Sequence, residues 1–230
     1  YIIDTHPQED HVGRLAGALN YATVGTVYGP MKSYDSRAFN SFLKYLDEQD
    51  VSITVPEPGE TFKLASADVK ILGPLQSSSN VNNNSIVLKV THGDISFLFT
   101  GDAEREAEQD ILAKEYDLNS IVLKVGHHGS NSSTTYPFLR EIMPKYAVIS
   151  VGSKNSYGHP TENVLSRLRD AEVKTFRTDM QGDIICVSDG ENVSFTVDRN
   201  PDVDTLGVVT KPTETPTPAP TSTPDRKSTR

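Results

Sequence analysis

The chain has 230 residues, 36% of them apolar and 23% charged, and a formal net charge of −9. This composition excludes a collagen and a coiled coil, and no stretch approaches the roughly 18 apolar residues of a spanning helix, so we expect no transmembrane segment in this chain. An acidic chain without a basic stripe is not expected to bind duplex nucleic acid stably. The single cysteine, Cys186, excludes a disulfide framework and predicts a buried, inert thiol.

Apolar residues recur at helical or strand spacing through most of the first 198 positions. Phe39, Phe42 and Leu46 fall on one helical face and predict a helix over 36–48, and the alternating run after it predicts a strand over 51–55. The other expected elements are, in chain order, strands 85–90 and 95–100 around a turn at 92–94, helix 103–115, strand 121–125, helix 134–142, strand 146–151, helix 161–170, strand 173–177 and a final pair of strands turned at 189–190. Strands that alternate with both helices and hairpins predict an α+β fold with two sheets packed face to face and helices outside.

Composition changes near the C-terminus. Proline and threonine dominate 213–224, a run that cannot bury enough apolar surface to fold. We therefore expect one folded domain over 1–198 and a disordered Thr/Pro-rich linker over 199–230, which implies a further C-terminal module. Such tethers are typical of secreted proteins, so we expect an extracellular or cell-surface location. Because Tyr1 opens directly into an apolar run, we expect a fragment or processed product without its signal peptide.

The segment Thr-His-Pro-Gln-Glu-Asp-His, residues 5–11, holds two imidazoles and a carboxylate just after an apolar run. His6, Asp10 and His11 are the residue types that borderline metals such as Zn²⁺ bind together. A polar helix start with Asp10 as its cap is the alternative for this segment on its own. Later loops in the chain bear on the choice.

Two later strands end in the same kind of loop. Asp102 follows an apolar strand, and the adjacent His127 and His128 follow the next one between glycines. By itself Asp102 could cap the following helix, and the two histidines could form a solvated loop. His159 follows a further strand, whereas His92 in a tight hairpin is expected to be an ordinary surface residue. Ligand-rich loops at three strand ends together predict one metal centre.

Five motifs occur in order along the chain: T-H-P-Q-E-D-H, N-N-N-S-I-V-L-K-V, F-T-G-D, K-V-G-H-H-G-S and N-S-Y-G-H-P. Together they resemble the metallo-β-lactamase superfamily, in particular the branch that contains the hydrolase domain of ComEC competence proteins and secreted phosphodiesterases, including phosphorylcholine esterases. The likeness spans nearly all of 1–198. It implies a four-layer αββα sandwich with the active site at the common edge of the two sheets.

The resemblance also implies a role for each matching residue. The implied metal ligands are His6, Asp10, His11, Asp102 and His128, the implied catalytic residues are Asp10, His127 and His159, and the implied substrate contacts are Asn84 and Ser130. Asp102 would bridge two ions, and Asp10 would also orient the nucleophile. His127 remains the alternative to His128 as the ligand, and the other member of the pair would face the substrate.

The sequence departs from the superfamily pattern at three places. Gln8 stands where most members have a second histidine, and the asparagines at 82–84 stand where many have another. The first metal subsite is therefore poor in imidazoles, so we expect one or two divalent ions, with Mn²⁺ as suitable as Zn²⁺. Members also begin with a strand hairpin ahead of the first motif, so we expect the domain to lack its first N-terminal strands.

These features together predict a metal-dependent hydrolase that uses a metal-bound hydroxide. The number of polar donors around the implied site favours phosphorus over an acyl centre, which predicts a phosphodiesterase or nuclease acting on a small phosphodiester or a short nucleic acid. A lactone or β-lactam hydrolase is one alternative. A surface binding module whose poor first subsite no longer supports turnover is the other.

Overall fold

The computed structural model describes residues 1–207, so the Thr/Pro-rich run at 213–224 lies outside the described residues. The strands are β1 Ile2–Ile3, β2 Val27–Tyr28, β3 Ile53–Thr54, β4 Thr61–Leu64, β5 Ala67–Gly73, β6 Val87–His92, β7 Ile95–Phe99, β8 Val122–Lys124, β9 Tyr146–Ile149, β10 Lys174–Arg177, β11 Ile184–Ser188 and β12 Val193–Val197. The α-helices are α1 Glu9–Val12, α2 Leu15–Leu19, α3 Arg37–Asp47, α4 Arg105–Ala113, α5 Tyr136–Ile142, α6 Glu162–Asp170 and α7 Thr178–Gln181, and the 3₁₀ turns are η1 Val81–Asn84 and η2 Gly126–Gly129.

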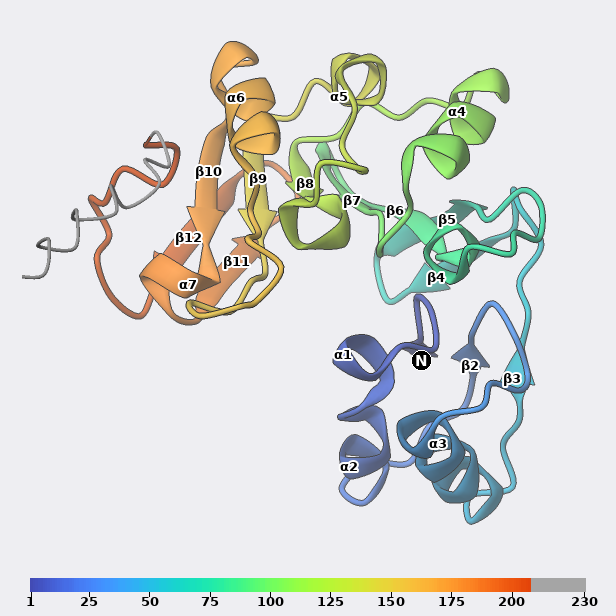
Figure 1. Ribbon diagram of the computed structural model, residues 1–230. Helices are drawn as coiled ribbons and strands as arrows, with labels where there is room; N and C mark the ends of the chain where they lie inside the picture. Colours follow the sequence, from blue (N-terminus) through green and yellow to red (C-terminus); the bar gives the residue numbers. More distant parts are fainter. Residues whose placement is uncertain (208–230) are drawn as a thin grey trace, which may run out of the picture.

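The strands form three sheets (Figure 1). The large sheet has the order β10-β9-β8-β7-β6-β5-β4, with parallel pairing from β10 to β7 and antiparallel pairing from β7 to β4. The small sheet is parallel, with the order β1-β2-β3. Strands β11 and β12 form a separate antiparallel hairpin.

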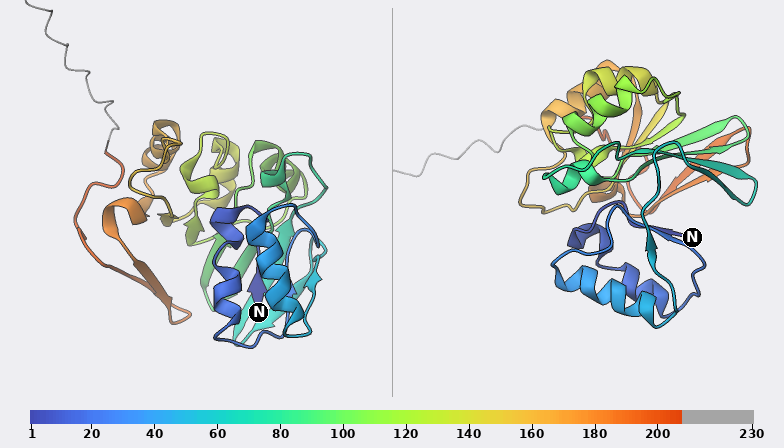
Figure 2. Two further views of the ribbon diagram at one scale, coloured as in Figure 1. Left: turned by 60° about the horizontal axis from the view of Figure 1, so that its bottom comes forward. Right: turned by 90° about the vertical axis from the view of Figure 1, so that its right-hand side faces the viewer.

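Three apolar clusters define four layers. The first packs α4, α5 and α6 on the large sheet and includes Leu123 and Phe138. The second packs α1, α2 and α3 on the small sheet around Phe39. The third joins the facing sides of the two sheets through Tyr28 and Ile86. Helices cover both outer faces with the sheets between them (Figure 2), so the expected αββα arrangement is confirmed.

Most expected elements fall within three residues of the observed ones, but the β4–β5 hairpin was not anticipated. Strand β4 lies at the edge of the large sheet and is mostly exposed, so its sequence lacks a buried apolar face. Its turn carries Ala65 at φ 51°, in the left-handed region that a glycine or asparagine usually occupies. Both signals that mark a hairpin in a sequence are therefore missing.

The β11–β12 hairpin lies against the end of the large sheet. Phe195 stacks on Phe176, with ring centroids 4.2 Å apart, and contacts Tyr146 at 5.0 Å. Cys186 is only partly buried on this hairpin, which corrects the expectation of a fully buried thiol. Burial is still sufficient to raise the pKa of Cys186.

The expected domain end at 198 is also wrong, because residues 199–207 continue to pack on the fold. Thr205 is buried, and its hydroxyl donates to the carbonyl of Thr175 at 2.6 Å. Arg177 donates to the carbonyl of Thr205 at 3.0 Å. The folded domain therefore includes residues 199–207. Across these described residues, the helices are too short or too polar for any of them to span a bilayer.

Candidate metal centre

The predicted ligands come from both sheets. His6 follows β1 of the small sheet, and Asp10 and His11 lie in α1 just beyond it. Asp102 follows β7 of the large sheet, and His128 lies in η2 after β8. Because these strands end at a common edge, their loops meet there. Helix α1 has Gln8 and α4 has Glu104 as N-cap residue, so neither Asp10 nor Asp102 serves as a helix cap.

The position of Asp102 depends on the glycine before it. Gly101 has φ 52°, and a Cβ atom there would lie 2.9 Å from Ser85 and 3.0 Å from Thr5. The backbone N–H of Asp102 donates to the Ser85 hydroxyl at 2.9 Å, and the side chain is buried. This close approach of the Gly101 backbone to the Ser85 and Thr5 side chains requires glycine and places the Asp102 carboxylate between the loops of the two sheets.

One oxygen of Asp102 faces a compact group of donors. Oδ1 lies 3.2 Å from Nε2 of His11 and 3.8 Å from Nε2 of His128. Nε2 of His128 lies 3.2 Å from both Nε2 of His11 and Oδ2 of Asp10. Ligand atoms bound about 2.0–2.2 Å from one tetrahedral ion are about 3.3–3.6 Å apart, so these side chains fit a divalent ion. We call Asp10, His11, His128 and Asp102 Oδ1 the compact side.

The other oxygen of Asp102 faces a second, looser group. Oδ2 lies 3.7 Å from Nε2 of His6 and 3.7 Å from Nε2 of His127, and His6 Nε2 lies 3.3 Å from Oε1 of Gln8. We call His6, Gln8, His127 and Asp102 Oδ2 the open side. Within residues 1–207, the candidate metal-binding group whose ligand atoms all lie within 4.8 Å of one another is Asp10, His11, Asp102 and His128. His6 and His127 lie outside it.

Charge at the centre suits a cation. The hydrogen bond from His128 lowers the pKa of Asp10 well below its usual range. Burial alone would raise the pKa of Asp102, but His11, His128 and His6 lower it overall. The pKa of His128 is raised, mainly by its hydrogen bond to Asp10. Burial, together with nearby His11, lowers the pKa of His6 to about 4, which leaves its ring neutral and able to bind a metal at neutral pH.

The two adjacent histidines occupy an unusual backbone conformation. His127 has φ 47° and ψ 46°, and His128 has φ 53° and ψ 21°, so both are left-handed. This conformation costs about 1–2 kcal/mol for each residue that is not glycine. It turns the two rings apart, with their planes 73° from one another. His128 is fixed further by its Nδ1, which lies 2.7 Å from the carbonyl oxygen of Ser150.

Two buried charged side chains, Glu108 and Arg167, hold the chain that follows these histidines. The Glu108 carboxylate accepts from the backbone N–H groups of Thr134 and Thr135 and from the Thr135 hydroxyl. Arg167 donates to the carbonyls of Ser133 and Thr134. Both side chains are at least nine-tenths buried, on α4 and α6. The segment 133–135 is thereby tied to α4 and α6.

The centre opens into a polar cavity of about 540 Å³. Its lining residues include Gln8, Asp10, Asn82, Asp102, His127, His128, Tyr157 and His159. The His159 ring contacts the His127 ring at 5.6 Å and stacks on the ring of Tyr157 at 5.8 Å. Burial and the neighbouring His127 lower the pKa of His159, so its ring is neutral at pH 7. The structure thus brings the two predicted catalytic histidines to one cavity with the metal ligands.

The two predicted substrate contacts do not line this cavity. The side-chain amide of Asn84 accepts from the N–H of Ser78 at 2.9 Å and donates to the carbonyls of Ser78 and Asn80, so it closes its own loop. The hydroxyl of Ser130 pairs with that of Ser132 at 3.0 Å. Asn82 lines the cavity instead, and its buried Oδ1 has no partner among the described residues.

Two acidic residues near the centre, Glu104 and Asp4, are not among the predicted site residues. Glu104 contacts His127, with Oε1 3.2 Å from Nδ1. Asp4 is buried two residues before His6, and neither of its carboxylate oxygens has a hydrogen-bond partner among residues 1–207. Burial raises the pKa of Asp4 to about 7. The only sequence signal for either residue was its nearness to a ligand motif.

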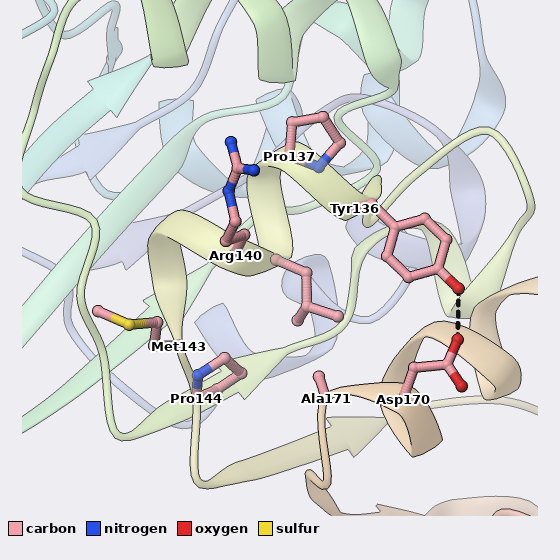
Figure 3. Close-up of a pocket in the computed structure, with 8 residues that line it drawn as sticks. Tyr136, Pro137, Arg140, Met143, Pro144, Asp170 and Ala171 are labelled. Carbon is pink, nitrogen blue, oxygen red and sulfur yellow. Dashed lines mark hydrogen bonds between the residues drawn. The ribbon is translucent and has the colours of Figure 1, made fainter.

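A second hollow, of about 550 Å³, lies between α5 and the end of α6 (Figure 3). Its walls are mostly apolar, with Tyr136, Leu139, Met143 and Ala171 among them. The Tyr136 hydroxyl donates to Asp170 at 2.5 Å across one end. None of the predicted metal ligands reaches this groove. The chemistry of the described residues therefore concentrates at the polar cavity.

The chain is similar in sequence to several curated proteins. The chain is 33% identical over 184 residues to ComE operon protein 3 of Bacillus subtilis, a match covering 80% of this chain and 24% of that protein. It is 41% identical over 117 residues to competence protein ComA of Neisseria gonorrhoeae, covering 50% of this chain and 17% of that protein. The chain thus spans a quarter or less of the length of these relatives.

Among solved structures, the metallo-beta-lactamase fold protein YhfI of Bacillus subtilis is similar over 84% of this chain and 76% of its own, with 11% identity and a TM-score of 0.48. The sequence model of the Metallo-beta-lactamase superfamily matches residues 1–153, two thirds of the chain. That match includes every residue of the compact side and of the open side. The chain belongs to the metallo-β-lactamase superfamily and has its metal-dependent hydrolase fold.

Proposed function

We propose that the chain is a metal-dependent phosphodiesterase that acts on small phosphodiesters or on short single-stranded nucleic acid. The observation that carries this proposal is the compact side opening directly into a polar cavity. A divalent ion bound there supplies an activated nucleophile at neutral pH and neutralises charge on a phosphate. Asp10, His11, Asp102 and His128 would hold it. Zn²⁺ suits their two imidazoles and two carboxylates, and the oxygen donor of Gln8 makes Mn²⁺ equally suitable on the open side.

The remaining cavity walls favour phosphorus over an acyl centre. A phosphodiester develops charge on several oxygens in its transition state, whereas a lactone or β-lactam develops it on one. The rings of His127 and His159 contact each other in the lining of the cavity, and Asn82 adds an amide to that lining. A neutral His159 ring can still donate one N–H to a phosphate oxygen. Asp10, at the open end of the compact side, is placed to orient the nucleophile.

The mouth of the cavity carries an aromatic ring. Tyr157 is 80% exposed, and its ring is stacked only on His159 among the ring contacts of the described residues. Exposed aromatic rings beside a catalytic centre stack on planar groups such as nucleobases. One relative is named a competence protein, and another, from Haemophilus influenzae, is named recombination protein 2. These features support a nucleotide or short nucleic-acid strand as substrate.

The setting of the domain is part of the proposal. The Thr/Pro-rich composition beyond the described residues supports an extracellular or cell-surface location and a further module after it. The overall charge of −9 argues against stable binding to a duplex, so a short strand whose charge the ion neutralises is the better partner.

A substrate panel tests the proposed activity. The protein would be loaded with Zn²⁺ or Mn²⁺ and assayed against bis-p-nitrophenyl phosphate, p-nitrophenyl phosphorylcholine, single-stranded DNA, a lactone and nitrocefin. We expect hydrolysis of phosphodiesters that EDTA abolishes and added metal restores. Hydrolysis of only the lactone or nitrocefin would favour the acyl alternative. Bound metal without turnover of any substrate would favour a binding module.

A further inference from the structure

Glu104 lies beside the metal centre and has no part in the roles described so far. It is the N-cap residue of α4, and its side chain is about one-fifth exposed. Oε1 of Glu104 lies 3.2 Å from Nδ1 of His127. We propose that Glu104 is a positioning residue, which fixes the His127 ring so that its other nitrogen faces the reacting centre. The catalytic part of this inference rests on the proposed function.

Three asparagines of one loop hold Glu104. Nδ2 of Asn82 donates to Oε1 at 2.9 Å, and Nδ2 of Asn80 donates to Oε2 at 3.0 Å. The backbone N–H of Glu104 donates to Oδ1 of Asn83 at 2.9 Å. Because both carboxylate oxygens and the main chain are held, the carboxylate has a single orientation. The asparagine-rich loop therefore acts on the site through Glu104.

This arrangement sets which nitrogen of His127 faces Glu104. A carboxylate only accepts hydrogen bonds, so Nδ1 must carry a proton to bond Glu104. Nε2 is then the nitrogen that faces the reacting centre, and it lies 3.7 Å from Oδ2 of Asp102 on the open side. The Ser132 hydroxyl is the other group near Nδ1, at a longer 3.4 Å. Carboxylates commonly set the tautomer and orientation of functional histidines in this way.

The ring of His127 needs such an anchor. Its backbone N–H donates to the carbonyl of Gly101 at 3.1 Å, which fixes the main chain in the left-handed region but leaves the side chain free to rotate. His128, by contrast, has its Nδ1 fixed by a backbone carbonyl. Each histidine of the pair thus has one partner behind the ring, a carbonyl for His128 and a carboxylate for His127.

The substitution Glu104→Gln tests the inference with a matched control. We expect kcat on bis-p-nitrophenyl phosphate to fall about 10- to 100-fold, with KM and bound metal unchanged, because a neutral amide bonds Nδ1–H more weakly than a carboxylate and can turn its NH₂ group toward the ring. Glu106→Gln is the control, since Glu106 accepts from Asn83 at 3.1 Å on the same loop without contacting His127. It should keep the wild-type rate. A wild-type rate in Glu104→Gln would overturn the proposal.

A double-mutant cycle separates positioning from a structural role. In a His127→Ala background, Glu104→Gln should lower kcat by less than about twofold, because a residue that acts through His127 has nothing left to position. An equal loss in both backgrounds would mean that Glu104 supports the loop as a whole, and would overturn the proposal.

A third measurement needs no substrate. The ring ¹⁵N shifts of His127, recorded by NMR at about pH 8 in the metal-free protein, should show a protonated Nδ1 in the wild type and a larger unprotonated fraction at Nδ1 in Glu104→Gln. An Nε2–H tautomer in the wild type would contradict the arrangement. If the wild type cleaves no phosphodiester, the proposed function fails, and this measurement still decides whether Glu104 positions His127.

Discussion

The compact side and the open side share the Asp102 carboxylate but differ in charge. The compact side adds Asp10, whose pKa is lowered like that of Asp102, so two carboxylates would face an ion bound there. The open side adds the neutral amide of Gln8 to its imidazoles. Affinity for a divalent cation rises with the number of charged oxygen ligands, so we expect the compact side to fill first and the open side more weakly. The number of ions bound thus depends on one or two neighbouring residues rather than on the fold.

Removing the shared carboxylate should give the largest effect. Asp102→Ala takes one oxygen from each side, so we expect hydrolysis to be abolished. Metal affinity should fall by more than about 100-fold, because losing a ligand costs more than losing a residue that only hydrogen-bonds a ligand. Activity assays and metal analysis by mass spectrometry would measure this. Asp94→Ala, at an exposed turn of the β6–β7 hairpin, is the matched control. If Asp102→Ala kept both its bound metal and its rate, the description of two sides that share this carboxylate would be wrong.

The adjacent histidines allow the two sides to be compared directly, because His128 belongs to the compact side and His127 to the open side. His128→Ala should lower metal affinity at least tenfold. His127→Ala should leave the first ion bound and raise the activation free energy by about 2.7–4 kcal/mol if its ring stabilises the transition state. Calorimetric metal titration and kcat/KM would be measured in parallel on both variants. Metal loss confined to His127→Ala would reverse the assignment of the two sides.

Asp4, a buried residue two positions before His6, tests whether a further carboxylate adds negative charge near the open side. Burial raises the pKa of Asp4 from an unfolded value near 4 to about 7, so the folded protein holds this proton and stability falls as pH rises through 7. Asp4→Asn should therefore raise the free energy of unfolding by about 2–4 kcal/mol at pH 8 and by less at pH 5. Urea titrations in EDTA would measure both. An equal gain at the two pH values would mean that Asp4 is charged throughout.

The smallest expected change is a gain in bound metal. Gln8→His places an imidazole where the open side has an amide, and Gln8 already lies 3.3 Å from His6. We expect Zn²⁺ content to rise from about one to about two ions per chain with little change in stability. Glu9→His, one residue along on α1, is the positional control. An unchanged Zn²⁺ content in Gln8→His would show that the open side does not hold an ion.

The sequence predicted the layers well because they depend on periodicity. Phe39, Phe42 and Leu46 do form the buried face of α3, and the apolar runs before Asp102 and His127 are strands. Loop detail was less accessible. In η1 successive side chains point about 120° apart, so the choice between Asn82 and Asn84 depends on a 3₁₀ turn that no residue type reveals.

The backbone of the histidine pair was hidden for a similar reason. The glycines on either side of His127 and His128 predicted a permissive backbone, and Gly129 does have φ 85°, but both histidines are left-handed as well. The side chains that hold the segment after them are distant in sequence, since Glu108 and Arg167 belong to two separate helices. Glu104 was missed because its link to His127 arises only when the asparagine loop folds against α4.

The placement of ligands on both sheets has a mechanical consequence. His11 and His128 lie 117 residues apart in the chain and 3.2 Å apart in space, one beyond the small sheet and one beyond the large sheet. An ion shared by them is a reversible cross-link between two halves that have separate apolar cores. Metal supply would then set how long the chain resists proteolysis, as well as how fast it works.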